Sequence, residues 1–118
     1  MAVVHVFFST SRFGTHGALR AFVDPTYTEH GEAIASPFMR EVGIVRVEPA
    51  CIEVEAGPVT QPIRRLLAGA SYASRWLGLL PDSVVANEAI CVFEPNEVGC
   101  PSAASSVTYC GSYTFSSE

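Results

Sequence analysis

Apolar positions along the chain form short runs and alternations that predict five strands. Residues 3–9 are a continuous apolar run rich in β-branched and aromatic side chains, which is typical of a buried strand. Residues 44–47, 51–55 and 88–94 predict three more strands. In residues 106–115 apolar and polar side chains alternate, which predicts a last strand with one packed and one solvent-facing side. Gly111 stands inside the apolar row of that strand and indicates a bulge or a close neighbour.

Helical spacing and capping residues predict four short helices between these strands. Thr15 is a candidate N-cap for the first helix, and Ser36 with a following proline marks the start of the second. The second helix is expected to stop near Gly43. Thr60 is expected to open the third helix and Ser71 to cap the fourth. The element order predicts an α+β fold with a mostly antiparallel sheet and helices packed on one of its faces.

Length and composition fit one folded domain spanning residues 1–118. Of the 118 residues, 48% are hydrophobic and 16% are charged, which excludes a disordered chain. No apolar run reaches the ~18 residues that cross a bilayer, so no membrane partner is expected. The first eight residues lack the basic segment and the long apolar run of a signal peptide, so we expect a cytoplasmic protein.

The charge distribution bears on the kind of partner. The chain has 12 acidic and 7 basic residues, a net charge of −5, and every base is an arginine. Five of the acids and none of the bases follow Arg75, so the excess lies in the last part of the chain. Acidic surface repels phosphate, which argues against a nucleic-acid partner, and it speeds the encounter with a basic protein.

Catalytic and metal-binding motifs are missing from the sequence. The three histidines and four cysteines have no zinc-ligand spacing, and no phosphate-binding glycine loop is present. We therefore expect no metal and no cofactor. Glu53 and Glu55 share one face of a predicted strand and form the one candidate carboxylate pair for an enzyme. A solvated strand face is the more ordinary interpretation of that pair.

The order and spacing of several segments carry a resemblance to a known family. These segments are an apolar strand at residues 4–8, a helix with Phe22, the Ser36-Pro37-Phe38 helix start, an acidic strand at 51–53, a serine-led segment at 71–77, and strands at 87–94 and 107–115. Together they resemble the immunity protein 22 family of bacterial polymorphic-toxin and type VI effector systems. The resemblance implies an inhibitor without catalytic residues that binds a cognate toxin domain, often a nuclease. We further expect a monomer or weak homodimer when the protein is free.

Three acidic regions are the candidate contacts for a basic toxin surface. The connection at residues 24–35 is too polar for a core and too long for a simple link. The second region is the strand face with the two glutamates at 53 and 55, and the third is the turn that precedes the last strand. The candidate residues are Asp24, Tyr27, Glu29, Glu32, Glu53, Glu55, Glu94, Asn96 and Glu97.

Two other functions stay open at this point. A small α+β enzyme would use Glu53, Glu55 or a histidine as a base and would hold it in a deep pocket with a shifted pKa. A self-associating or ligand-binding module would expose Tyr109, Tyr113 and Phe115 together.

Overall fold

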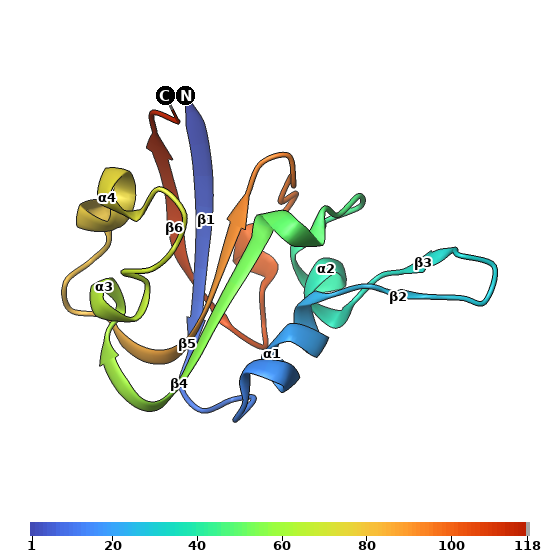
Figure 1. The fold of residues 1–118 in the computed structure, drawn as a ribbon, viewed down its shortest axis with the longest axis horizontal. Helices are drawn as coiled ribbons and strands as arrows, with labels where there is room; N and C mark the ends of the chain where they lie inside the picture. Colours follow the sequence, from blue (N-terminus) through green and yellow to red (C-terminus); the bar gives the residue numbers. More distant parts are fainter. Residues whose placement is uncertain (118) are drawn as a thin grey trace.

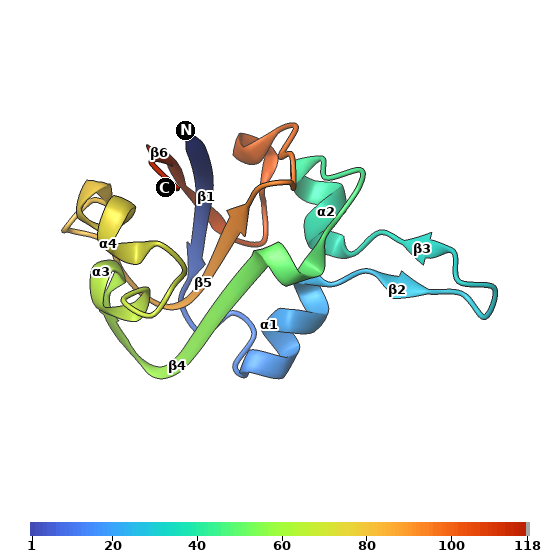
Figure 2. The ribbon, with the colours of Figure 1, turned by 45° about the horizontal axis from the view of Figure 1, so that its top comes forward.

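A computed structural model describes residues 1–117 and places a four-stranded antiparallel sheet between two groups of short helices (Figure 1). The strand order across the sheet is β4–β5–β1–β6, so β4 and β6 are its edges. A separate pair, β2 and β3, forms a hairpin that projects from one end of the body (Figure 2). The strands are β1 (Ala2–Ser9), β2 (Thr26–Tyr27), β3 (Ala33–Ile34), β4 (Ile52–Pro62), β5 (Val85–Phe93) and β6 (Thr108–Phe115). The helices are α1 (His16–Val23), α2 (Pro37–Val42), α3 (Ile63–Leu66) and α4 (Ala73–Trp76), with the 3-10 turns η1 (Pro49–Cys51), η2 (Leu77–Leu79) and η3 (Pro101–Ala103).

The predicted α+β fold with an antiparallel sheet is confirmed, but the helices cover both faces of the sheet and not one. On one face, α1 and α2 pack on side chains that include Phe7 and Ile90. On the other face, α3 and α4 pack on side chains that include Val6 and Cys91. Because neighbouring residues of a strand point to opposite faces, the continuous apolar runs of β1 and β5 supply two cores. This double covering buries nearly all of β5 and the middle of β1.

Two of the predicted helix starts are confirmed by their capping bonds. The Thr15 hydroxyl accepts the N–H of Ala18 at 3.0 Å, and the Ser36 hydroxyl accepts the N–H of Met39 at 3.1 Å. The second helix ends at Gly43, which adopts a left-handed conformation with φ 75°.

Two predicted helix starts on the other face are wrong. The strand β4 continues through Thr60 to Pro62, and α3 begins only at Ile63. Ser71 does not cap α4, because its hydroxyl and its N–H both donate to the carboxylate of Glu53. A serine that is bonded to another strand is not available to cap its own helix.

The strand predicted at residues 44–47 is also wrong, because the segment finds no strand partner. The two residues just before this segment accept hydrogen bonds from the connection after β5. Gly99 N–H donates to Gly43 O at 3.2 Å, and Cys100 N–H donates to Val42 O at 2.9 Å. Val45 lies in the open with 89% of its surface exposed. Its apolar, β-branched character therefore reflects neither core packing nor a sheet ladder.

The bulge indicated at Gly111 is present in β6. Val6 of β1 pairs with Gly111 and Phe7 pairs with Tyr109, so Cys110 is the extra residue. One extra residue moves every later side chain to the other face of the sheet. Tyr109 accordingly packs with the α1–α2 core, whereas Phe115 packs with the α3–α4 core.

Candidate functional site

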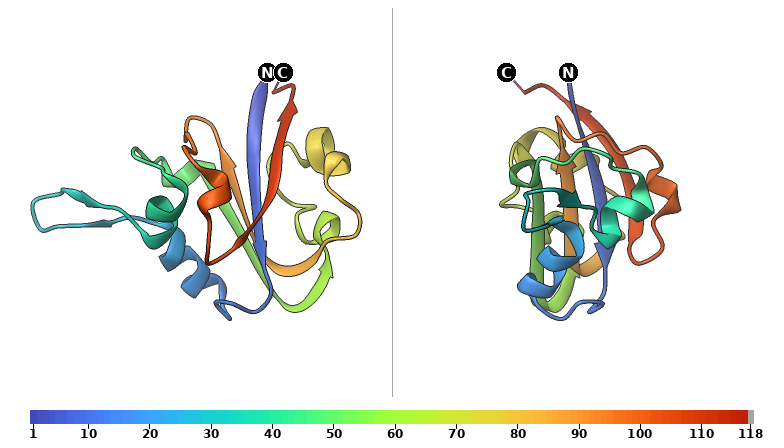
Figure 3. Two further views of the ribbon diagram at one scale, coloured as in Figure 1. Left: turned by 180° about the vertical axis from the view of Figure 1, so that it is seen from behind. Right: turned by 90° about the vertical axis from the view of Figure 1, so that its right-hand side faces the viewer.

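The most prominent surface feature is the projecting hairpin, residues 24–35, which we call the arm. It extends along the longest axis of the molecule and away from the sheet (Figures 1 and 3). In its two short strands, Thr26 pairs with Ile34 and Tyr27 pairs with Ala33. Tyr27 is 60% exposed and Ile34 is 48% exposed. Because directly paired residues share a face, these two apolar side chains lie on opposite faces of the arm.

The arm is fixed firmly at its base. The Arg20 guanidinium in α1 forms an ion pair with Asp24 at 2.7 Å. The same guanidinium donates to the carbonyl oxygens of Ile52 at 2.6 Å and Pro49 at 2.9 Å. Asp24 is therefore half-buried and holds the beginning of the arm to the body.

The tip of the arm is shaped by its own residues. The Thr28 hydroxyl accepts the N–H of Glu32 at 3.1 Å and that of His30 at 3.3 Å. Thr28 N–H donates to Glu32 O, and Gly31 takes a positive φ of 83° that glycine adopts without strain. The side chain of Glu29 is 89% exposed, and Glu32 is exposed as well. The tip thus presents two carboxylates to solvent.

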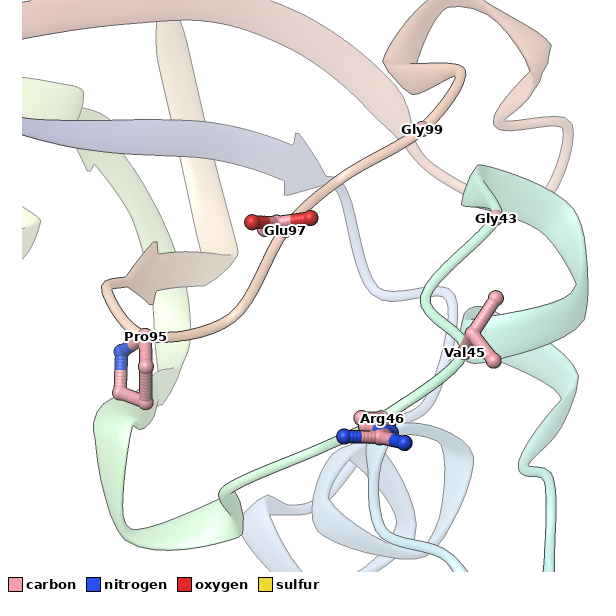
Figure 4. Close-up of a pocket in the computed structure, with 6 residues that line it drawn as sticks. All are labelled: Gly43, Val45, Arg46, Pro95, Glu97 and Gly99. Carbon is pink, nitrogen blue, oxygen red and sulfur yellow. The ribbon is translucent and has the colours of Figure 1, made fainter.

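A second surface feature is a pair of adjoining hollows beside the end of β5. The first, about 590 Å³, lies between the segment after α2 and the segment after β5 (Figure 4). Val45 and Arg46 line one side, and Pro95 and Glu97 line the other. The second hollow, about 640 Å³, shares Pro95 and Glu97 and continues over the end of β1. Its lining residues are Val3, His5, Glu94, Pro95, Asn96, Glu97 and Val98.

Residues 94–97 form a rim between the two hollows, and Asn96 holds this rim in place. Its side chain is buried, its Oδ1 accepts Glu48 N–H at 2.7 Å, and its Nδ2 donates to the carbonyl oxygens of Glu48 and Phe93 at 3.1 Å each. Glu94 and Glu97, on either side, are exposed. The rim therefore has one internal amide that orients it and two carboxylates that face outward.

His5 lies on the wall of the second hollow. Its Nδ1 is 3.0 Å from the hydroxyl of Tyr109. Burial lowers the pKa of His5 from its usual 6.5, so the imidazole is neutral at neutral pH. His5 was not among the candidate residues, because a single histidine within an apolar strand carries no signal that places it beside the rim.

Other carboxylates, by contrast, are engaged inside the molecule. Glu88 in β5 is 1% exposed and accepts the Ser9 hydroxyl at 2.8 Å. It also accepts the backbone N–H groups of Arg12, Phe13 and Gly14 at 2.7–3.2 Å. Burial by itself would raise the pKa of Glu88, but these hydrogen bonds outweigh it and hold the pKa below its usual 4.5. We call residues 9–14, which wrap around this carboxylate, the clamp loop.

Two further carboxylates bind serine residues in the same manner. Glu53 accepts the hydroxyl and the N–H of Ser71, which ties the α3–α4 connection to β4. Glu41 accepts the Ser106 hydroxyl at 2.5 Å and the N–H groups of Ser105 and Ser106 at 2.9 Å. These contacts lower the pKa of Glu41 against the opposing effect of burial. Sequence reasoning missed all three roles, because a glutamate and a distant serine carry no spacing signal.

The structure therefore separates the residues that the sequence grouped as candidates. The arm carries Tyr27, Glu29 and Glu32 at the surface, and Asp24 at its base. The rim carries Glu94 and Glu97 outward and Asn96 inward. Glu53 and Glu55 lie elsewhere, since their side of β4 is shared with Cys51, which packs on the α3–α4 core.

The arrangement offers little support for catalysis at the predicted carboxylate pair. Glu53 is bonded to Ser71, and neither of the two hollows is lined by Glu53 or Glu55. Within residues 1–117, no three His, Cys, Asp or Glu side chains lie together as a metal site would require. In the same residues, every helix is too short or too polar to cross a membrane. The aromatic side chains of β6 are not exposed together, since Phe115 is buried and Tyr109 and Tyr113 are half-buried.

The fold and surface thus define a small α+β protein whose accessible features are a projecting arm and an open, acid-rimmed hollow. The sequence model of a family described as Immunity protein 22 matches residues 4–116. The chain belongs to this family, as the resemblance noted above predicts. The protein therefore has the general role of an immunity protein, which is to neutralise a toxin. No curated protein and no solved structure matches the chain.

Proposed function

We propose that this protein neutralises a cognate bacterial nuclease toxin by covering the toxin's substrate-binding surface with the arm and the rim. A nuclease must present a basic surface to hold phosphates. Carboxylates of an inhibitor can occupy the same positions, and a few apolar anchors can supply most of the packing energy. The protein would act in the cytoplasm of the producing cell, as a free monomer or weak homodimer, without a cofactor and without chemistry of its own. Delivery of the toxin by a type VI system is part of the same proposal.

The observation that carries the proposal is the arm. It projects from the body, exposes Tyr27 on one face and Ile34 on the other, and presents Glu29 and Glu32 at its tip. A two-stranded hairpin with both faces in water is marginally stable by itself. An element of this kind gains most when a partner covers both faces. We therefore propose that the arm enters a cleft of the toxin.

The rim supplies the second part of the proposed interface. Glu94 and Glu97 are exposed, and they border two adjoining hollows that could receive protruding side chains of the toxin. Asn96 and Asp24 act in this proposal by holding the rim and the arm in position. Glu55 is exposed but lies on the β4 side of the sheet, so we place it outside the main contact.

Co-expression with the toxin domain from the neighbouring gene tests the function. Rescue of growth together with co-purification of the two proteins is the expected result. A toxin that kills equally well in the presence of this protein, or one that is not a nuclease, would contradict the corresponding part of the proposal.

Charge reversal tests the surface. The variants Glu32→Arg and Glu97→Arg each change the net charge by the same amount as the control Asp82→Arg, which lies between η2 and β5. We expect the first two to slow association about threefold to tenfold at low salt and to weaken its salt dependence, and the control to have little effect. Equal association rates for all three variants would show that arm and rim carboxylates do not guide binding.

A further inference from the structure

The two edges of the sheet are built differently. Edge strands expose unpaired backbone groups, and proteins usually protect them with charges, prolines or irregularities. The β4 edge has all three: Glu53 and Glu55, Pro58, and a break in its ladder with β5, where four residues, 57–60, lie opposite the single Asn87. This edge is well protected against the addition of another strand.

The β6 edge lacks most of this protection. Its eight residues, Thr108–Phe115, contain no charged residue and no proline. One bulge interrupts it at Cys110, and the residues from Gly111 to Phe115 then continue in regular register with β1. Among residues 1–117, no strand pairs with the outer side of this stretch.

The side chains on both faces of this stretch suit a paired strand. Ser112 and Thr114 are exposed on one face, and both are small and uncharged. On the other face, Tyr113 is half-buried and Tyr72, which is 49% exposed, stacks on Phe115 with ring centroids 5.3 Å apart. A strand added here would meet hydroxyl groups on one side and, on the other, aromatic surface with the Arg75 guanidinium at its end, 6.0 Å from the centre of the Tyr72 ring.

We propose that residues 111–115 pair antiparallel with the same residues of a second copy, so that two sheets join into one across a two-fold axis. The occupant is a second copy because the strand is compatible with itself: two uncharged strands meet without like-charge contact, and Phe115 of each copy lies opposite Gly111 of the other, beside the Tyr113 ring that covers this glycine. The arm points away from β6, so both arms of the dimer stay accessible (Figure 3).

The expected dimer is weak. Five paired residues span only about 17 Å, and the contact falls below the ~1,200 Å² of a standard stable interface. The net charge of −5 on each copy opposes association, so salt should strengthen the dimer. This salt dependence is opposite to that expected for a basic toxin, which makes the two associations distinguishable.

Sedimentation equilibrium of the free protein, without any toxin, tests the pairing. We expect a dissociation constant in the micromolar range that decreases as salt is raised from about 50 to 500 mM. Thr114→Lys places two ammonium groups near the axis and should weaken the dimer at least tenfold. Thr60→Lys makes the same charge change on the protected β4 edge and should leave dimerisation unaffected. Urea unfolding of both variants verifies that the fold is retained.

Two results would overturn this proposal. One is a wild-type protein that stays monomeric up to about 500 µM at high salt, far above the concentration at which a micromolar dimer forms. The other is equal dimerisation of Thr114→Lys and Thr60→Lys. If the wild-type protein is monomeric and Thr114→Lys lowers its affinity for the toxin, the β6 edge pairs with a strand of the toxin and not with a second copy. These results are independent of the co-expression experiment, which tests whether the protein neutralises the toxin through the arm and the rim.

Discussion

The clamp loop and the arm are both connections that carry the chain away from a buried element, but they bond in opposite ways. The clamp loop, residues 9–14, gives its N–H groups to the buried Glu88 of a strand far away in the sequence. The arm, residues 24–35, bonds mainly to itself beyond its base and keeps the carboxylates of its tip, Glu29 and Glu32, in water. The same side-chain type therefore stabilises the fold in one region and stays available to a partner in the other. Net charge alone does not distinguish the two uses.

The largest expected effect is the loss of the clamp. Glu88→Ala leaves the Ser9 hydroxyl and three N–H groups of the clamp loop without an acceptor in a partly buried site. We expect a loss of about 3 kcal/mol in the free energy of unfolding, measured by urea denaturation. The exposed Glu55→Ala is the matched control and should change stability by less than about 0.5 kcal/mol. Similar losses in both variants would mean that Glu88 does not act as a clamp.

Acid should destabilise the protein through the engaged carboxylates. Hydrogen bonds lower the pKa values of Glu88 and Glu41 below 4.5 in the folded state, so the unfolded state binds more protons as the pH falls. Their stabilisation is present above about pH 4.5 and is lost as the pH falls through the lower, folded-state values. The lowered pKa of His5 acts in the same direction from about pH 6.5 downward. Urea midpoints measured between pH 7 and pH 3 should fall, and the fall should be smaller in Glu88→Gln.

The rim should become less stable when the buried side-chain amide of Asn96 is removed. Asn96→Ala removes three hydrogen bonds to backbone groups of Glu48 and Phe93, and we expect it to lower the free energy of unfolding by about 2 kcal/mol. Because it loosens the rim, it should also weaken toxin binding although Asn96 is buried. The neighbouring Glu97→Ala, which removes only an exposed side chain, should leave stability unchanged in the same urea experiment. An Asn96→Ala variant with full toxin affinity would exclude the rim from the interface.

The smallest effect on stability is expected at the arm. Thr28→Val keeps the shape of the side chain but removes the hydroxyl that accepts the N–H groups of His30 and Glu32. Since the arm packs little against the body, unfolding should change by less than about 0.5 kcal/mol. Toxin affinity, measured by titration, should nevertheless fall about tenfold, because the tip loses its defined shape. Unchanged affinity would show that the shape of the tip does not contribute to recognition.

Part of the fold could be predicted from local signals. The apolar run of β1, the caps at Thr15 and Ser36, and the glycine that ends α2 are each determined by a few neighbouring residues. The bulge at Gly111 also had a local signal, since a glycine interrupts an apolar row. The predictions failed where a residue is bonded to a distant segment. Ser71 resembles a helix cap in the sequence, but Glu53 takes its hydroxyl.

The candidate site shows the same division. Tyr27, Glu29 and Glu32 were predicted from the length and polarity of their segment, and the structure places them on one arm. The hollow lined by Val45 and Arg46 was missed, since these residues resemble a strand by composition.

The sequence by itself determined the buried strands, the first two helix starts and the family of this protein, because each depends on residue patterns that the chain carries locally or in a fixed order. The tertiary structure alone decided which carboxylates are engaged and which are available. A carboxylate is neutralised or exposed by the groups that surround it in space. At Glu88 those groups lie more than seventy residues away in the chain.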